Sequence, residues 1–257
     1  MNSLIHPTSI IHDGAKIHES VQIGPYTIIN KDVDIDEGTS IGSHVVIDGL
    51  TKIGKNNKIF SHNSIGQQPQ DKKYNNEPTR LEIGDSNTIR EFCTINTGTV
   101  QDEGVTRIGS HNWIMAYVHI AHDCQLANNI IMANNSSLAG HVHIDEYAIL
   151  GGFTLVHQFC KIGSHIMTAV GTKIFKDVPD YMMVHGEKAS PSGINLEGLK
   201  RRNFTNSEID SIKEAYKIIY RQNNTANEAV EKLAFSSDPN IIKLASFIKN
   251  SSRGIVR

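Results

Sequence analysis

Seven of the thirteen histidines in this 257-residue chain fall in one stretch, between His111 and His165. Within that stretch, His122 is followed directly by Asp123. A neutral imidazole can take a proton from an attacking hydroxyl group, and a neighbouring carboxylate can fix the tautomer of the ring. Several histidines that the fold brings together can also bind zinc. The stretch therefore predicts a site of acid–base catalysis or of metal binding, depending on which side chains meet.

An aliphatic residue recurs at every sixth position along most of the chain. The series runs over 5–65, resumes over 83–95 and resumes again over 108–174, and of its 26 hexads only one, led by Thr168, lacks an aliphatic lead. Neither the period of a helix nor that of a simple strand explains a strict six, whereas hexapeptide repeats are typical of parallel β-helices. The composition agrees, because 35 Ile against 11 Leu favours strands.

Three hexads make one triangular coil of 18 residues, so the sequence can be converted into positions in space. One coil after His122 comes Gly140, and one coil after Asp123 comes His141. A glycine there leaves a backbone N–H open to a developing oxyanion, which suits acyl transfer. No Ser or Cys stands in a nucleophile-elbow sequence, so we expect direct attack by the acceptor without a covalent acyl-enzyme. The coil length predicts one crowded corner made of His122, Asp123, Gly140, His141, His157 and Gln158.

Two polar loops, at 66–82 and 100–107, interrupt the hexads and are long enough to suggest a functional role. The three cysteines all occupy the fifth position of a hexad, a core slot, so we expect buried thiols. The start of the chain lacks the pattern of a signal peptide, and no apolar run approaches the roughly 20 residues of a membrane span. We therefore expect a cytoplasmic protein that does not insert into membranes.

The hexads end near Pro179, and helical patterns follow. Capping-box sequences begin at Thr205 and Thr225, and Asp238 precedes a proline at a helix start. The apolar spacing predicts helices over 207–222, 226–235 and 239–250. We thus predict a β-helical domain over 1–189 and a small helical domain over 190–257.

Charge is unevenly divided between these two parts. The chain carries a net charge of −2, but residues 200–257 hold 11 Lys or Arg against 6 Asp or Glu, which gives +5. A basic end on an acidic body indicates an acidic partner. We expect no nucleic-acid partner.

Four segments together resemble one enzyme family: HIAHDC (119–124), LAGHV (138–142), VHQFC (156–160) and NLEGLKRR (195–202). The chain is similar over essentially its whole length to the bacterial UDP-N-acetylglucosamine O-acyltransferases of lipid A biosynthesis. The resemblance implies a left-handed parallel β-helix and a homotrimer with active sites between subunits. It also implies transfer of an (R)-3-hydroxyacyl group from acyl carrier protein to the 3-hydroxyl of UDP-N-acetylglucosamine. The acyl group is then delivered on the phosphopantetheine of the carrier protein, and no further cofactor or metal is expected.

The resemblance also implies roles for individual residues. It makes His122 the general base and Asp123 its support, and it turns the amide of Gly140 toward the oxyanion. Ten residues match positions around the substrates: Gln70, Asp71, Lys73, His119, His141, His157, Gln158, Asn195, Glu197 and Arg201. Of these, the three from 195 onward match the nucleotide end of the cleft.

The carrier protein is acidic, so three neighbouring cations are expected to dock it: Lys200, Arg201 and Arg202. Val170 stands where the resemblance implies the ruler for acyl-chain length. A branched side chain there should select chains shorter than about fourteen carbons, since about 0.8 kcal/mol of burial is at stake per methylene.

Three alternatives stay open at this point. A zinc-dependent prism of the carbonic-anhydrase kind would use the same histidines as ligands. A purely structural solenoid would need neither aligned histidines nor loops. The related N-acyltransferase that acts later in the same pathway usually carries a uridine-binding domain before the hexads, which here begin at Ile5.

Overall fold

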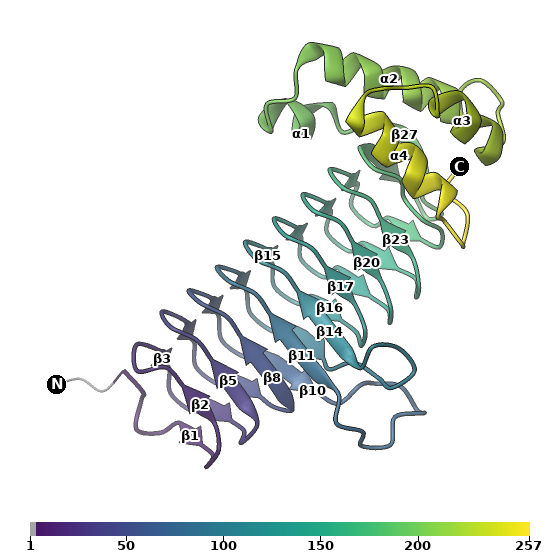
Figure 1. Cartoon of the computed structure of the whole chain (residues 1–257). Coiled ribbons are helices and arrows are strands. Elements are labelled where there is room, and N and C mark those ends of the chain that lie inside the picture. Colours follow the sequence, from purple (N-terminus) through teal and green to yellow (C-terminus); the bar gives the residue numbers. More distant parts are fainter. Residues whose placement is uncertain (1–3) are drawn as a thin grey trace.

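The computed structural model describes residues 4–257 and shows a triangular prism of stacked coils with helices at one end (Figure 1). Within these residues the chain forms 27 strands and four helices. Residues 1–3, where the predicted β-helical domain begins, lie outside the described part. The predicted left-handed parallel β-helix with a helical C-terminal region is confirmed.

The walls of the prism are three sheets whose strands come from successive coils, so up to β25 every third strand along the chain is a neighbour, while β24, β26 and β27 end the third sheet. Sheet 1 contains β1 (Ile10–Ile11), β4 (Ile28–Ile29), β7 (Val46–Ile47), β10 (Ser64–Gln67), β13 (Thr94–Asn96), β16 (His119–Ile120), β19 (Ser137–Leu138), β22 (Leu155–Val156) and β25 (Lys173–Ile174). Sheet 2 contains β2 (Lys16–Ile17), β5 (Val33–Ile35), β8 (Leu50–Ile53), β11 (Arg80–Ile83), β14 (Val105–Ile108), β17 (Gln125–Leu126), β20 (His143–Ile144) and β23 (Lys161–Ile162). Sheet 3 contains β3 (Gln22–Ile23), β6 (Ser40–Ile41), β9 (Lys58–Ile59), β12 (Thr88–Ile89), β15 (Trp113–Ile114), β18 (Ile131–Met132), β21 (Ile149–Leu150), β24 (Met167–Thr168), β26 (Met182–His185) and β27 (Ser190–Ile194).

The coil length of 18 residues is confirmed by the strand register, in which Ile120 pairs with Leu138 and Leu138 with Val156. These leads point inward and are buried, as the hexad pattern requires. Where the loops interrupt the hexads, Ile65 still pairs with Ile95, so the inserted residues leave the stacked leads in place. Figure 1 shows both loops projecting beside β10, β11 and β14.

The three cysteines are buried and unbridged, as predicted from their core position. Burial raises the pKa of the Cys93 and Cys160 thiols to about 11 and that of Cys124 to about 12. At neutral pH all three are thus protonated thiols that fill space in the core.

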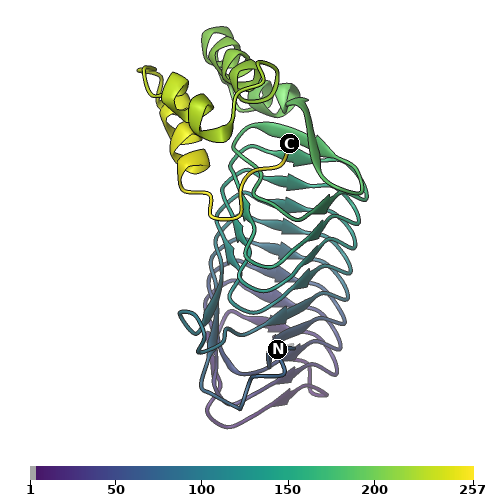
Figure 2. The ribbon, with the colours of Figure 1, turned by 90° about the vertical axis from the view of Figure 1, so that its right-hand side faces the viewer.

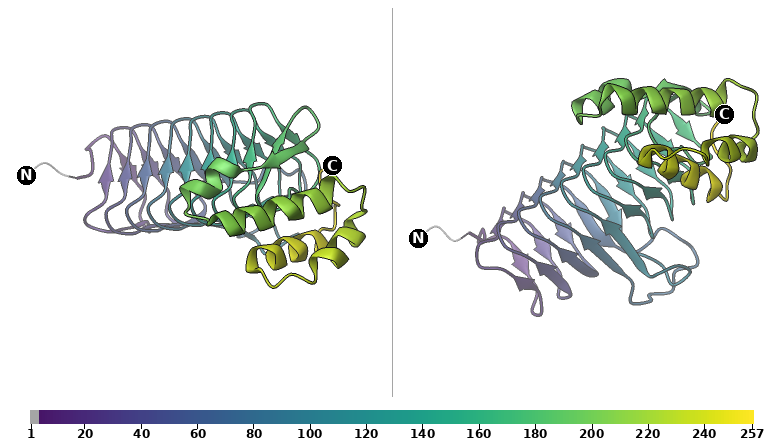
Figure 3. Two further views of the ribbon diagram at one scale, coloured as in Figure 1. Left: turned by 90° about the horizontal axis from the view of Figure 1, so that it is seen from above. Right: turned by 45° about the horizontal axis from the view of Figure 1, so that its top comes forward.

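Four helices follow the strands: α1 (Leu196–Arg201), α2 (Asn206–Tyr220), α3 (Ala226–Leu233) and α4 (Pro239–Lys249). Both predicted capping boxes are present at α2 and α3, and Asp238 caps α4. The domain boundary between 189 and 190 stays a prediction. At that point β27 pairs with β26, and Leu196 is the first helical residue. Figure 3 shows the helices lying over the last coils.

After α4 the chain returns to the prism, and its end lies beside the last coils (Figure 2). Asp177 forms a parallel bridge with Ile255, and its amide donates to the carbonyl of Gly254 (3.0 Å). The Ser251 hydroxyl donates to Asp177 Oδ2 (2.6 Å). These bonds hold the tail on the prism. Over residues 4–257, every helix is too short or too polar to cross a membrane.

Candidate active site

Three stacked turns between sheets 1 and 2 carry the predicted cluster, and we call them the histidine corner (residues 121–124, 139–142 and 157–160). The amide of His141 donates to the carbonyl of His122 (3.0 Å), and that of Phe159 donates to the carbonyl of Gly140 (3.1 Å). The turns are therefore stacked as the 18-residue register predicted. Asp123, His141 and Phe159 share a left-handed backbone, with φ of 59°, 60° and 64°. Asp and His tolerate this conformation better than most residues do.

His122 is oriented by its neighbour in the chain. Its Nδ1 lies 2.8 Å from Asp123 Oδ2. Because a carboxylate only accepts hydrogen bonds, Nδ1 carries a proton, and in the neutral ring Nε2 has the lone pair. This is the tautomer that a general base requires.

Thr99 binds the Asp123 carboxylate through two hydrogen bonds. The Thr99 amide donates to Asp123 Oδ1 (2.8 Å), and the Thr99 hydroxyl donates to Oδ2 (2.6 Å). Burial raises the pKa of the Asp123 carboxyl, but the hydrogen bonds from His122 and Thr99 lower it more, and the pKa lies below its ordinary value. The buried group is thus a carboxylate with a full set of donors, which stabilises the charge.

Gly140 lies against the His122 ring. A Cβ built on Gly140 would be 2.5 Å from His122 Cε1 and 2.7 Å from Nε2. Only glycine fits at this separation. Within residues 4–257 the amide N–H of Gly140 donates to no acceptor.

His141 forms a second carboxylate–imidazole pair next to the first. Its Nδ1 lies 2.8 Å from Asp102 Oδ2, and its Nε2 lies 3.8 Å from Asp123 Oδ2. The ring meets that of His122 edge-on, with centroids 5.0 Å apart, and stacks on Phe159 at 4.3 Å. The site thus contains two adjacent dyads.

Sequence reasoning missed Thr99 and Asp102. Both belong to the second interruption or its edge, where the hexad register no longer places residues. The only signal was the loop itself, which emerges at the corner that carries the histidines. The structure shows that this region supplies the donor to the Asp123 carboxylate, from Thr99, and the carboxylate partner of His141, from Asp102.

Two other predicted histidines flank the dyads. His119 lies on β16, with Nδ1 2.7 Å from the Thr94 hydroxyl oxygen. Burial, and secondarily the neighbouring His122, holds the pKa of His119 below its ordinary value, so the ring is neutral at pH 7. His157 lies in the third turn, where Arg253 Nη2 approaches its Nδ1 at 3.3 Å. Gln158 beside it is exposed.

Comparison with known proteins assigns this chain to a family. A family model described as Udp N-acetylglucosamine O-acyltransferase, domain 2, matches residues 177–256, and a model of the bacterial transferase hexapeptide matches 14–49 and 106–140. The acyl-[acyl-carrier-protein]–UDP-N-acetylglucosamine O-acyltransferase of Thiobacillus denitrificans is 59% identical over 255 residues, which cover 98% of this chain and 99% of the relative. The enzyme of the same name from Herminiimonas arsenicoxydans is 56% identical, over 99% of this chain and all of the relative. This chain belongs to the acyl-[acyl-carrier-protein]–UDP-N-acetylglucosamine O-acyltransferase family.

Solved structures agree. LpxA from Acinetobacter baumannii superimposes with a TM-score of 0.97 at 47% identity and covers 99% of this chain and 100% of its own. The UDP-N-acetylglucosamine acyltransferase of Francisella novicida gives 0.96 at 45% identity, over 98% of this chain and 94% of its own. The protein is therefore an acyltransferase.

The first loop of the acyltransferase carries three predicted substrate contacts, between β10 and β11. Gln70 and Lys73 are exposed, and the Asp71 carboxylate accepts from the Lys73 amide (3.0 Å). Within residues 4–257 no hydrogen bond joins these three residues to the dyads. Their contact with substrate stays a prediction.

The predicted nucleotide end lies at α1, away from the dyads along the prism. Asn195 is buried, and its side chain accepts from the Gly198 amide (3.1 Å) and donates to the His165 carbonyl (2.9 Å). The side chain therefore caps α1 and ties it to the last coils, and a nucleotide contact by Asn195 stays a prediction. Glu197 pairs with Lys200 at 3.4 Å, and both side chains are exposed.

The cations predicted to dock the carrier protein differ in surroundings. Lys200 and Arg201 are exposed, whereas the Arg202 guanidinium carbon lies 4.3 Å from the centroid of the Tyr147 ring. Burial holds the pKa of Arg202 below its ordinary value.

Val170, the predicted ruler, is 77% exposed on the turn between β24 and β25. An exposed valine there is free to contact a ligand.

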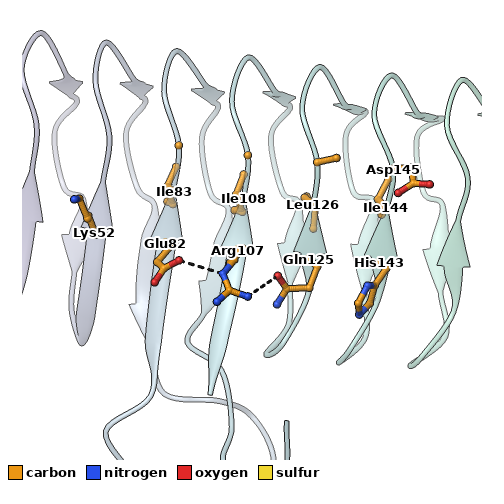
Figure 4. A pocket seen from close by; sticks show the side chains of 13 residues that line it. Lys52, Glu82, Ile83, Arg107, Ile108, Gln125, Leu126, His143, Ile144 and Asp145 are labelled. Atoms are coloured by element: carbon orange, nitrogen blue, oxygen red, sulfur yellow. Dashed lines mark hydrogen bonds and ion pairs between the residues drawn. The ribbon is translucent and has the colours of Figure 1, made fainter. Parts of the chain in front are cut away.

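A groove of about 730 Å³ lies outside the histidine corner, along the outer face of sheet 2 (Figure 4). Charged and polar side chains line it in a row, among them Lys52, Glu82 and Arg107. Arg107 donates to Glu82 (3.1 Å) and to Glu103 (2.6 Å), so its charge is satisfied within the protein. The outer face of sheet 2 is thus a row of solvated side chains, among which Arg107 pairs with two glutamates.

Proposed function

We propose that this acyltransferase moves an (R)-3-hydroxyacyl group from acyl carrier protein to the 3-hydroxyl of UDP-N-acetylglucosamine, the first step of lipid A biosynthesis. The names of the relatives support the two substrates. The observation that carries the mechanism is the close approach of the His122 ring to Gly140, where an added Cβ would lie 2.7 Å from Nε2, together with the bond from Nδ1 to Asp123.

In this mechanism His122 acts as the general base. Its Nε2 lone pair takes the proton of the sugar hydroxyl while the hydroxyl oxygen forms a bond to the thioester carbonyl carbon. The carbonyl oxygen becomes an oxyanion and accepts a hydrogen bond from the Gly140 amide. The carbon–sulfur bond then breaks, and the phosphopantetheine thiolate takes the proton from the imidazolium. Asp123 stabilises the imidazolium between these two transfers.

We propose direct transfer without a covalent acyl-enzyme. The obvious nucleophile near the dyad is Cys124, which is buried, and burial raises the pKa of its thiol to about 12. The Thr99 hydroxyl donates a hydrogen bond to Asp123, but Thr99 is only 1% exposed, so a thioester carbonyl does not reach it. The acceptor hydroxyl is therefore the group best placed to receive the acyl chain.

A metal-dependent reaction is the competing function, and one observation favours it. One donor atom from each of His122, Asp123 and His141 lies within 4.8 Å of the others. However, Asp123 already accepts from the His122 ring and from the Thr99 amide and hydroxyl. A zinc ion would have to displace these hydrogen bonds. We propose that the reaction uses no metal or other cofactor, and activity that survives exhaustive chelation would support this.

The substrates extend from the dyads in the proposed complex. The first-loop residues and His119, His141, His157 and Gln158 contact the sugar, pyrophosphate or acyl group, and Glu197 and Arg201 contact the nucleotide. The basic segment at 200–202 docks the acidic carrier protein. The enzyme is cytoplasmic, and its active sites lie between the subunits of a homotrimer. Light scattering on the purified chain tests the assembly.

The proposed ruler gives the donor preference. If Val170 ends the acyl groove, the wild-type enzyme prefers chains shorter than about fourteen carbons, and Val170→Gly shifts the preference toward longer donors. Relative kcat/KM for donors of increasing length measures this. An unchanged preference in the variant would remove Val170 from the role.

The function itself is tested by incubating the protein with 3-hydroxyacyl carrier proteins and UDP-N-acetylglucosamine. We expect His122→Ala to lower kcat/KM by about 10²–10⁴, the usual worth of a general base. His111→Ala, which alters an exposed histidine at another corner of the prism, is the matched control and should leave activity unchanged. Near wild-type turnover by His122→Ala would refute the mechanism, and no turnover by the wild type would refute the substrates.

A further inference from the structure

The second dyad contains a group that the proposed mechanism does not use. Asp102 lies on the second loop, 39 residues before His141 in the chain, and its Oδ2 is 2.8 Å from His141 Nδ1. The Asp102 side chain is 41% exposed, while that of His141 is 11% exposed. An exposed carboxylate on a mobile loop would not stay hydrogen-bonded to one imidazole. The pairing therefore depends on the contacts that fix the loop.

The loop is fixed on both sides of Asp102. The Asp102 amide donates to the carbonyl of Thr99 (3.2 Å), and Thr99 is bound to Asp123. On the other side Glu103 forms an ion pair with Arg107 (2.6 Å). The same loop thus braces the carboxylate of the first dyad and supplies the carboxylate of the second.

The pairing determines which nitrogen of His141 carries the proton. A carboxylate oxygen only accepts, so His141 Nδ1 donates to Asp102, and in the neutral ring Nε2 keeps the lone pair. The Nε2 atom is 3.8 Å from Asp123 Oδ2, too far for a hydrogen bond. Within residues 4–257, His141 Nε2 makes no hydrogen bond and is not fully buried, and the His141 side chain is 11% exposed.

We propose that Asp102 is a positioning residue that holds His141 as a hydrogen-bond acceptor toward the substrate. His141 then recognises a hydroxyl or amide N–H of the bound sugar nucleotide, and it does not act as a donor to phosphate. The inference rests on the proposed function for the identity of the substrate, but the tautomer of His141 is a property of the free enzyme.

Removal of Asp102 should change which nitrogen of the His141 ring carries the proton. In Asp102→Ala, the one carboxylate among residues 4–257 that still pairs with His141 is that of Asp123, which faces Nε2, so the proton should move to Nε2. The acceptor is then lost. We expect the KM for UDP-N-acetylglucosamine to rise about tenfold, the equivalent of one hydrogen bond, while kcat changes by less than about threefold.

Asp102→Asn is the conservative variant, because its amide oxygen can still accept from Nδ1. It should keep KM within about threefold of the wild type. Gln101→Ala is the matched control on the same loop, since the Gln101 side chain is exposed and, within residues 4–257, forms no hydrogen bond to either imidazole. It should leave KM unchanged.

A spectroscopic readout separates positioning from a merely structural role. Nitrogen-15 NMR of the full-length enzyme, with the His141 signals assigned by their loss in His141→Ala, reports which ring nitrogen is protonated. We expect Nδ1–H in the wild type and in Asp102→Asn, and Nε2–H in Asp102→Ala.

Two results would overturn the proposal: an unchanged tautomer in Asp102→Ala, or a KM effect that persists in full when His141 is already alanine. Because the NMR readout needs no substrate, a wild-type enzyme inactive on UDP-N-acetylglucosamine would refute the proposed function and leave the tautomer test standing.

Discussion

Gly140→Ala tests the active-site geometry with a single methyl group. The new Cβ would lie 2.5 Å from His122 Cε1 and 2.7 Å from Nε2, whereas carbon atoms in contact are normally about 3.5–4.0 Å apart. The ring must therefore move by about 1 Å. It cannot retreat freely, because Nδ1 is bound to Asp123 at 2.8 Å. A displacement of this size at a reacting group costs about 10²-fold in rate.

We expect Gly140→Ala to lower kcat about 100-fold, with little change in KM, because alanine keeps the backbone N–H and the substrate contacts. Steady-state kinetics with the carrier-protein donor measure both constants. Gly152→Ala is the control, since a Cβ there meets only the Asn134 carbonyl oxygen at 3.4 Å. Thermal melts establish that both variants fold. A folded Gly140→Ala enzyme with kcat within threefold of the wild type would show that the His122 ring is not confined as described.

Two further predictions follow from buried polar groups. Thr99→Val removes the 2.6 Å hydrogen bond from the hydroxyl to the Asp123 carboxylate but keeps the bond from the backbone amide. We expect kcat/KM to fall about tenfold in the same assay. An unchanged kcat/KM would mean that the amide alone holds the carboxylate. Burial, with Arg202 and Lys243 nearby, lowers the pKa of His165 to about 4. Between pH 6.5 and pH 4 the unfolded chain therefore takes up a proton that the folded chain does not, and the free energy of unfolding decreases as the pH falls. For this partly exposed ring we expect the loss between pH 8 and pH 5 to be about 1 kcal/mol, and His165→Phe should abolish it in urea unfolding; an equal pH dependence in both proteins would refute the assignment.

The hexad pattern predicted the parts of the site that lie in register. His122, Asp123, Gly140 and His141 meet because each coil adds a fixed number of residues, and the stacking of turns follows directly from that count. The helices α2, α3 and α4 could also be predicted from the sequence, since their capping residues are local signals.

The loop residues could not be placed in this way. Thr99 and Asp102 belong to an insertion, where residue number no longer maps onto height along the prism, so their contacts depend on how the loop folds back. Arg253 reaches His157 only because the tail is bonded to Asp177, a pairing between distant segments that neither segment encodes alone. Asn195 matched a nucleotide-binding position in sequence, yet its side chain also caps α1.

The sequence by itself determined the β-helix, the helical end and the column of residues at the histidine corner, because a strict repeat converts chain distance into spatial distance. Only the tertiary structure decided that Asp102 pairs with His141 and that Thr99 donates to Asp123. These hydrogen bonds depend on the path of an irregular loop, and that path is set by many weak contacts outside the repeat.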